Sequence, residues 1–313
     1  AELNKRRLER QLTTGFDELL RTTASSLRLA SSLIEYQVGR QRFTKSPDAY
    51  DLDVLEGIDQ LATPAIIPHV QLPIEQMYHG SRLAPKGVRY IHQLFLGRQK
   101  QSLAALWSKA NALEDLRLRS FMLFAMEQAI WGMSLLNRYG PTHFSQVNRI
   151  LSGVYYISSL ISEVSPWYIL NGKTRRIVKA FSEFVAQPGA SVMTTASAAV
   201  APTAEESVDY IFTDPPFGEN IYYADLNFLV ESWHKVLTNS EPEAIIDQAK
   251  RKTLADYQEL MRHSFRSYYN WLKPGRWMTV EFHNSHNAVW MAIQEALLST
   301  GFVVADVRTL DKQ

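Results

Sequence analysis

The chain has 313 residues, 46% of them hydrophobic, so it can bury a substantial core and wholesale disorder is not expected. It has no cysteine, which excludes disulfides and thiolate metal sites within these residues and fits a cytoplasmic protein. No apolar run is long enough to span a bilayer, so we expect no membrane partner.

The net charge of +1 conceals an uneven distribution along the chain. Residues 82–180 contain fourteen Lys and Arg against four Asp and Glu, whereas residues 181–313 contain ten against seventeen. A basic segment of this size is typical of a surface that faces a polyanion such as DNA. A solvated basic face, balanced by the acidic half, explains the same distribution equally well.

Residues 1–80 are expected to form an N-terminal helix and hairpin segment. The first thirty residues are basic and read as helical, and apolar and polar residues then partly alternate over 32–45 with Gly39 at the break. A short amphipathic helix is expected over 51–61. Prolines then mark an irregular connection.

Residues 81–190 are predicted to be a helical, basic region. Apolar side chains recur at helical spacing through 94–139, and Gly140-Pro141 ends that stretch. A second helix is expected over about 174–184.

From residue 191 onward strands alternate with helices, which predicts an α/β fold with a mostly parallel sheet. The expected strands cover 191–195, 208–213, 277–282 and 302–307, with a turn at 273–275, and the expected helices cover 226–237, 253–272 and 287–299.

The strand expected at 208–213 ends in Asp214-Pro215-Pro216-Phe217. The exocyclic amine of a nucleobase is a poor nucleophile because its lone pair is delocalised into the ring. A catalyst must therefore accept hydrogen bonds from the amine and hold the flipped base against a methyl donor. Asp214 can accept one N–H and the Pro215 carbonyl the other, while Phe217 offers a stacking face and Pro216 helps to stiffen the loop. In isolation, a rigid turn explains these four residues equally well.

The flanking residues carry a family resemblance. Residues 208–217, followed by Tyr222-Tyr-Ala-Asp-Leu226 and Trp233, resemble the large bacterial and archaeal adenine-specific DNA methylases that often carry a zinc ribbon. Upstream, Phe95, Arg98 and Gln99 match a Phe-x-x-Arg-Gln element of the family. Further similar segments are 33–43, 47–51, 103–107, 281–283 and Trp290.

This resemblance implies a class I AdoMet-dependent methyltransferase, with a Rossmann-like sheet and a helical basic flanking or insertion domain. Residues 191–313 would be the catalytic part of the methyltransferase domain. AdoMet would donate a methyl group to the exocyclic amine of adenine in double-stranded DNA, and Asp214 at the start of the loop leans toward adenine over cytosine.

Three further groups are candidate binding residues. By resemblance, Phe95, Arg98 and Gln99 would lie beside the cofactor, although ordinary packing at a helix start also explains them. A second group could shape the base pocket or form a core aromatic pair with a capping carboxylate; it consists of Tyr222, Tyr223 and Asp225. A third group is a basic cluster that could contact phosphates or form a solvated face; it consists of Lys173, Arg175 and Arg176.

No metal site is expected. His283 and His286 are three residues apart, but no carboxylate or cysteine stands at ligand spacing beside them. A helix cap at Asn284 or Ser285 is a simpler interpretation of this segment.

The sequence also departs from the family pattern. Neither the glycine-rich AdoMet loop nor the zinc-ribbon cysteines are present, and Gly153, Gly172 and Gly189 are isolated. The chain therefore resembles the C-terminal part of a longer family member, with an N-terminal part or partner subunit supplying the AdoMet loop. Two alternatives stay open: an RNA or cytosine amino-methyltransferase, and a non-catalytic nucleic-acid-binding subunit of a split methylase.

Overall fold

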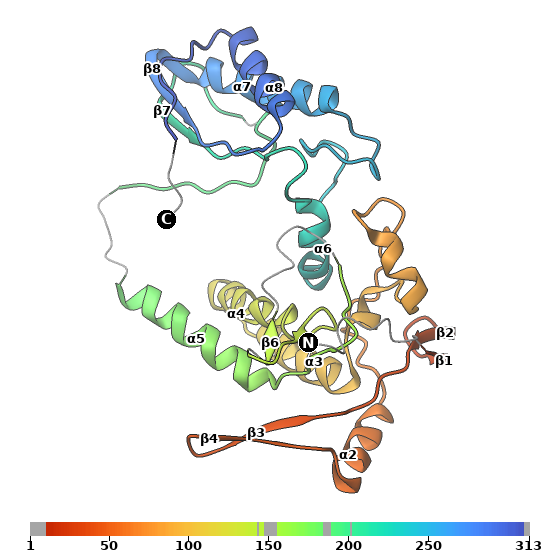
Figure 1. The fold of residues 1–313 in the computed structure, drawn as a ribbon. Helices are drawn as coiled ribbons and strands as arrows, with labels where there is room; N and C mark the ends of the chain where they lie inside the picture. The colour runs from red at the N-terminus through yellow and green to blue at the C-terminus, as the bar shows by residue number, and fades with distance from the viewer. Residues whose placement is uncertain (1–10, 143, 147–154, 184–188, 201, 310–313) are drawn as a thin grey trace. The chain divides into compact units, whose positions relative to one another are not determined.

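The computed structural model describes residues 11–142, 144–146, 155–183, 189–200 and 202–309 (Figure 1). The chain divides into two compact units. The N-terminal unit comprises Ala1–Val185 and Asn227–Leu237, and the C-terminal unit comprises Ala186–Leu226 and Thr238–Gln313.

Two antiparallel hairpins open the described part of the N-terminal unit. β1 (Leu12–Asp17) pairs with β2 (Thr22–Leu27), and β3 (Ile34–Val38) pairs with β4 (Gln41–Lys45). The second hairpin confirms the expectation for 32–45.

The prediction of a helix over the first thirty residues is wrong, because β1 and β2 form a hairpin there. Residues 1–10 lie outside the described part. Thr13 and Phe16 favour extended backbone because their branched or aromatic side chains fit a pleated surface. The Asp17 carboxylate then accepts the amides of Leu19 and Leu20, at 3.1 and 3.2 Å, and so reverses the chain.

The remainder of the N-terminal unit is mainly helical, as expected. α2 begins two residues earlier than predicted because Asp48 and Asp51 form a reciprocal capping box. Asp115 caps α4 by accepting the amides of Arg117 and Leu118. The elements are α2 (Ala49–Asp59), the 3-10 turns η1 (Gly80–Arg82), η2 (Ala84–Lys86) and η3 (Ile91–Leu94), α3 (Gly97–Asn111), α4 (Leu116–Ile130), the short strands β5 (Arg138–Tyr139) and β6 (Ser145–Gln146), and α5 (Pro166–Glu183).

One hydrophobic core holds the N-terminal unit together. Trp107 packs against Trp233 with ring centroids 5.2 Å apart, and Phe95 meets Trp233 edge-on at 5.8 Å. Trp233 lies in the part of α6 (Tyr223–His234) that belongs to this unit. These ring contacts join α3 and the segment before it to α6 within this core.

The C-terminal unit is built on a parallel strand pair. β7 (Val208–Thr213) lies beside β8 (Leu272–Val280) with Ile211 opposite Met278 and Thr213 opposite Val280. α7 (Leu254–Trp271) and α8 (Asn287–Ser299) pack on each other and on one face of this pair, where Met278 and Val280 contact their core (Figure 1). The mixed α/β class is thus shown.

Three details of the C-terminal unit differ from the sequence expectations. The turn expected at 273–275 lies inside β8, where Gly275 has a φ of +72° and the pairing register shifts. The segments 191–195 and 302–307 form no strand, because a strand needs a neighbouring strand and neither segment joins a β-ladder with the described residues. Helices α6, α7 and α8 lie close to their expected ranges.

Within the described ranges, no helix combines the length and the apolar character that crossing a membrane requires.

Candidate catalytic loop and its supports

The Asp-Pro-Pro-Phe loop begins at the carboxyl end of β7, the edge at which open α/β sheets bind ligands. Two buried side chains from other elements hold its backbone. The Tyr257 hydroxyl on α7 donates to the Pro216 carbonyl at 2.5 Å, and the Asn284 amide donates to the Phe217 carbonyl at 2.6 Å. Burial raises the pKa of Tyr257, so its hydroxyl keeps the proton that it donates.

Gly218 ends the loop in a conformation that favours glycine. Its φ is +88°, and an added Cβ would lie 3.3 Å from side-chain carbons of both Ile246 and Val289. Its carbonyl accepts the amide of Ile246 at 3.2 Å. The loop is therefore fixed at three successive carbonyls, from Pro216 to Gly218.

The two groups with expected chemical roles at the start of the loop differ in exposure. Asp214 is exposed, and its carboxylate has no hydrogen-bond or ion-pair partner among the described residues. Pro215 is buried, which anchors the loop beside it. An exposed, unengaged carboxylate on a rigid loop can accept a hydrogen bond from a ligand without first breaking an internal one.

Phe217 belongs to a chain of edge-on aromatic contacts. Its ring meets Phe282 at 5.5 Å and 89°, and Phe282 meets Trp290 at 4.9 Å and 88°. The Trp290 indole donates in turn to the Asn284 carbonyl at 2.8 Å. Phe217 is half-buried, so this packing orients a ring of which part stays open for stacking.

The expected base-pocket residues separate into two kinds. Tyr222 and Asp225 are buried, and the Asp225 carboxylate accepts Lys250 at 2.8 Å, within a network in which Lys250 also meets Asp247 at 3.0 Å. Burial works against the Lys250 charge, but the two carboxylates outweigh it and raise its pKa. Burial and this ion pair therefore hold Tyr222 and Asp225 at the start of α6.

Tyr223 is the member of this group that stays exposed. Burial of part of its ring raises the pKa of its hydroxyl, and the carboxylates of Asp214 and Glu243 add to that rise. The tyrosine is thus the candidate pocket residue that shares an electrostatic environment with Asp214.

Sequence reasoning missed the residues that support this site. Glu243 accepts the Ala224 amide at 3.0 Å at the start of α6, and burial raises its pKa. Tyr257 and Asn284 bind the loop backbone from 41 and 67 residues away. No local pattern marks Tyr257 or Glu243, whereas Asn284 was noticed only as a helix cap. Its side chain accepts the His286 amide at 2.7 Å, but the N-cap of α8 is His286, so the cap predicted at Asn284 or Ser285 is wrong.

The other predicted binding residues lie in the N-terminal unit. Phe95 and Gln99 are buried, the former against Trp233 and the latter capping α3 through the Leu96 amide at 3.0 Å. Arg98 donates to both carboxylate oxygens of Glu163, at 3.0 and 2.7 Å, and this pairing raises its pKa. The structure does not bring these three side chains around one opening.

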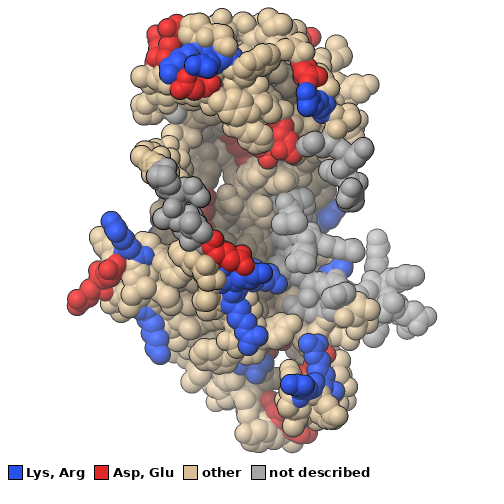
Figure 2. All heavy atoms as spheres, turned by 90° about the vertical axis from the view of Figure 1, so that its left-hand side faces the viewer, with Lys and Arg blue, Asp and Glu red and all other residues tan. Residues whose placement is uncertain are grey.

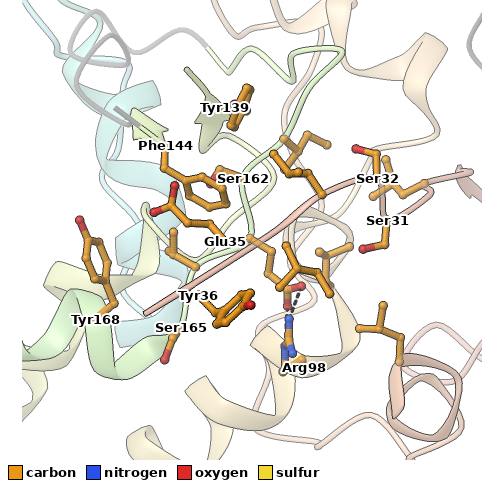
Figure 3. Close-up of a pocket in the computed structure, with 18 of the residues that line it drawn as sticks. Ser31, Ser32, Glu35, Tyr36, Arg98, Tyr139, Phe144, Ser162, Ser165 and Tyr168 are labelled. Atoms are coloured by element: carbon orange, nitrogen blue, oxygen red, sulfur yellow. Dashed lines mark hydrogen bonds and ion pairs between the residues drawn. The ribbon is translucent and has the colours of Figure 1, made fainter. Parts of the chain in front are cut away.

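Arg98 instead lines a cavity within the N-terminal unit (Figure 3). The basic residues Lys173, Arg175 and Arg176 lie on α5, which starts at that cavity. Figure 2 shows Lys and Arg side chains in separate groups on this face and not as one continuous basic surface.

His283 and His286 are not assembled into a metal centre in the described ranges. His286 Nε2 lies 3.4 Å from a carboxylate oxygen of Glu219, and no described group of three or more His, Cys, Asp or Glu residues has the geometry to hold an ion.

No protein-family model, curated protein or solved structure matches the chain. The function proposed below therefore rests on the geometry of the loop and on its chemistry.

Proposed function

We propose that the chain is part of an AdoMet-dependent methyltransferase that modifies the exocyclic amine of adenine in DNA. One observation carries the proposal: an exposed carboxylate, Asp214, starts a rigid loop at the carboxyl end of a parallel strand. The loop carbonyls that follow are held by Tyr257 and Asn284.

The loop residues would act on the amine of a flipped base. Asp214 accepts one N–H and the Pro215 carbonyl accepts the other, which draws the nitrogen toward tetrahedral geometry and localises its lone pair. Phe217 and Tyr223 limit the position of the ring. AdoMet, when bound, would supply the methyl group.

The described residues do not supply a recognisable cradle for AdoMet. Gly172 lies inside α5 with open space around it, Gly189 lies in a segment without secondary structure, and Phe95 and Gln99 have internal roles. We therefore assign no contact to the cofactor, and the proposal includes a further polypeptide segment that supplies one.

The exposed face of the β7–β8 pair supports the proposal of a further polypeptide segment. Parallel sheets are almost always covered on both faces. On the face of β7 and β8 opposite α7 and α8, Tyr210, Phe212 and Trp277 are 54%, 61% and 66% exposed. A larger Rossmann-like sheet with a second helical layer would cover these rings.

DNA as substrate rests on less direct support. The cations of α5 are suited to phosphates, and the preference for adenine over cytosine or an RNA base rests on the resemblance of the loop. Methylation assays on each polymer distinguish these substrates.

The deciding experiment measures transfer of a labelled methyl group from AdoMet to unmethylated DNA, by the chain alone and with a polypeptide that carries a glycine-rich strand–turn–helix. Asp214→Ala is expected to reduce transfer by roughly 100-fold or more, as for removal of one preorganised charge-stabilising group. Asp209→Ala on β7, which removes an exposed carboxylate paired with Lys273, is the matched control. Transfer that survives Asp214→Ala would show the assignment to be wrong.

A second candidate is a non-catalytic nucleic-acid-binding subunit, and the lack of an AdoMet cradle among the described residues favours it. A titration with AdoMet separates the two. DNA binding without AdoMet binding, both by the chain alone and by the chain with the added polypeptide, would support the non-catalytic subunit.

A further inference from the structure

A cavity of about 1040 Å³ lies within the N-terminal unit (Figure 3). Its walls come from β3 and the segment before it, from α2, from the start of α3, and from residues 159–168, which lead into α5. Ligand-binding cavities commonly enclose roughly 300–1,000 Å³, so this one has room for more than one planar ring.

Aromatic side chains from separate elements line this cavity without being buried. Tyr36 on β3 is 43% exposed, and Trp167 and Tyr168 in the first turn of α5 are 67% and 65% exposed. The Tyr36 ring is held by stacking on Phe43 across the hairpin, at 5.6 Å and 25°. Preplaced, exposed rings of this kind form platforms on which a planar ligand can stack.

The polar groups of the lining suit the edge of a nucleobase. The Arg98–Glu163 pair and the Glu35–Arg42 pair, at 3.6 Å, place donors and acceptors at fixed positions, and Ser31 and Ser32 add hydroxyls (Figure 3). Carboxylates accept from base amines, and Arg donates to base carbonyls and ring nitrogens. Because Asp59 adds a third carboxylate, the cavity itself does not favour a phosphate.

A basic stripe leaves the cavity along α5. Tyr168, Arg175 and Lys179 are spaced by seven and four residues, so they lie on one face of the helix. Gly172 lies between them on the same side, and a Cβ there would meet nothing within 4 Å. A glycine at this point lets a ligand approach the helix backbone closely.

We propose that this cavity binds an unpaired nucleobase of a single-stranded DNA segment, with the adjoining phosphates along the Arg175–Lys179 stripe of α5. The choice of DNA as the polymer rests on the proposed function. The site itself uses none of the loop residues, and its occupancy does not require methyl transfer.

The test measures binding of a labelled single-stranded oligonucleotide of about 15 nucleotides to the full chain, beside the same sequence as a duplex. Tyr168→Ala should weaken single-strand binding at least about fivefold, the loss expected for one base–aromatic stack. Tyr50→Ala, which removes an exposed ring of α2 that does not line the cavity, should have no such effect. Circular dichroism shows whether each variant is folded.

The salt dependence tests the stripe. Replacing both Arg175 and Lys179 with Ala should lower the slope of log affinity against log salt concentration by about 1.4, since each single-strand phosphate contact contributes about 0.7. Arg117→Ala on α4 is the matched control. Trp167 provides an independent signal, because its fluorescence should be quenched by the bound strand and the quench should disappear in Trp167→Phe.

Three results would overturn the proposal. These are equal losses in Tyr168→Ala and Tyr50→Ala, duplex binding as tight as single-strand binding, or AdoMet binding that depends on Tyr168 and excludes the oligonucleotide. Asp214-dependent methylation with single-strand binding unchanged by Tyr168→Ala would leave the proposed function standing and this site refuted. Single-strand binding that depends on Tyr168, without any methylation, would support the cavity site and refute the proposed function.

Discussion

At the residue scale, the loop depends on groups that contact its backbone rather than on its own side chains. Tyr257 is fully buried, and its hydroxyl donates to the Pro216 carbonyl. Two prolines restrict φ, but they leave the orientation of the carbonyls to such partners. The position of Asp214 is therefore set partly by α7.

Tyr257→Phe tests this dependence. The substitution keeps the ring but leaves the Pro216 carbonyl without that donor, so the free energy of unfolding should fall by about 1–3 kcal/mol. Urea denaturation measures the change, with an unchanged m-value if the fold is retained. Tyr269→Phe, at a half-exposed ring packed on Phe302, should change stability by less than about 0.5 kcal/mol. Equal effects of the two substitutions would contradict the assigned hydrogen bond.

Glu243 should give stability a pH dependence. Burial raises its pKa in the folded chain above the ordinary value of 4.5, the charge of Asp225 adds to this, and the Ala224 amide, Lys250 and Lys252 oppose it. A raised folded pKa means that its stabilising contribution is present below the unfolded pKa and is lost as pH rises through the folded pKa.

Glu243→Gln removes this titration and keeps an oxygen that accepts the Ala224 amide. The variant should therefore be more stable than the parent at neutral pH, and the difference should close as pH falls below about 4.5. Thermal unfolding across this range measures it, with Glu241→Gln as the exposed neighbouring control. A difference that grows toward acid pH would contradict the sign.

At the element scale, replacing each of two glycines with alanine should change stability in opposite directions. Gly172 lies on α5, and Gly132 packs against Ile169 of α5. Gly172→Ala should raise the free energy of unfolding by about 0.5–1 kcal/mol, because alanine favours the helix and the added Cβ meets nothing. Gly132→Ala should destabilise, since a Cβ there would lie 2.6 Å from Cδ1 of Ile169 on α5. Chemical denaturation of both variants checks this opposition.

The elements were predictable where local chemistry decides them. Asn287–Ser299 forms α8 at its expected bounds, and the periodicity of α3, α4 and α7 sufficed because each buries one face. The β1–β2 hairpin was missed because the helical, basic reading of the first thirty residues outweighed the strand preference of Thr13 and Phe16. The strand expected at 302–307 depended on a neighbour that the described residues do not provide.

The candidate site was predictable in part. Local sequence placed Asp214 after a strand, which the structure confirms. The remaining contacts join residues far apart in the chain. These are the ion pair of Asp225 with Lys250 and the hydrogen bonds of Tyr257 and Asn284 to the loop. Such long-range pairings leave no periodic signal, so they could not be predicted from spacing.

At the scale of the whole molecule, the exposed face of the β7–β8 pair is the surface on which the proposed additional polypeptide would pack. Tyr210 and Trp277 are opposite each other in the register, and Phe212 extends the same face. Contiguous exposed rings of this kind drive association or aggregation in water. The chain alone should therefore bind a hydrophobic dye and self-associate as its concentration rises.

Replacing Tyr210 and Phe212 with Ser should reduce both effects, because it removes apolar area from the uncovered face while α7 and α8 still cover the other. Light scattering across a concentration series measures the association. Val192→Ser with Met193→Ser is the matched control, since these side chains are 86% and 95% exposed in a segment without secondary structure. If an added polypeptide that confers AdoMet binding also suppresses dye binding by the parent chain, the result supports docking on the uncovered face. Dye binding that persists in the assembly would place the docking elsewhere.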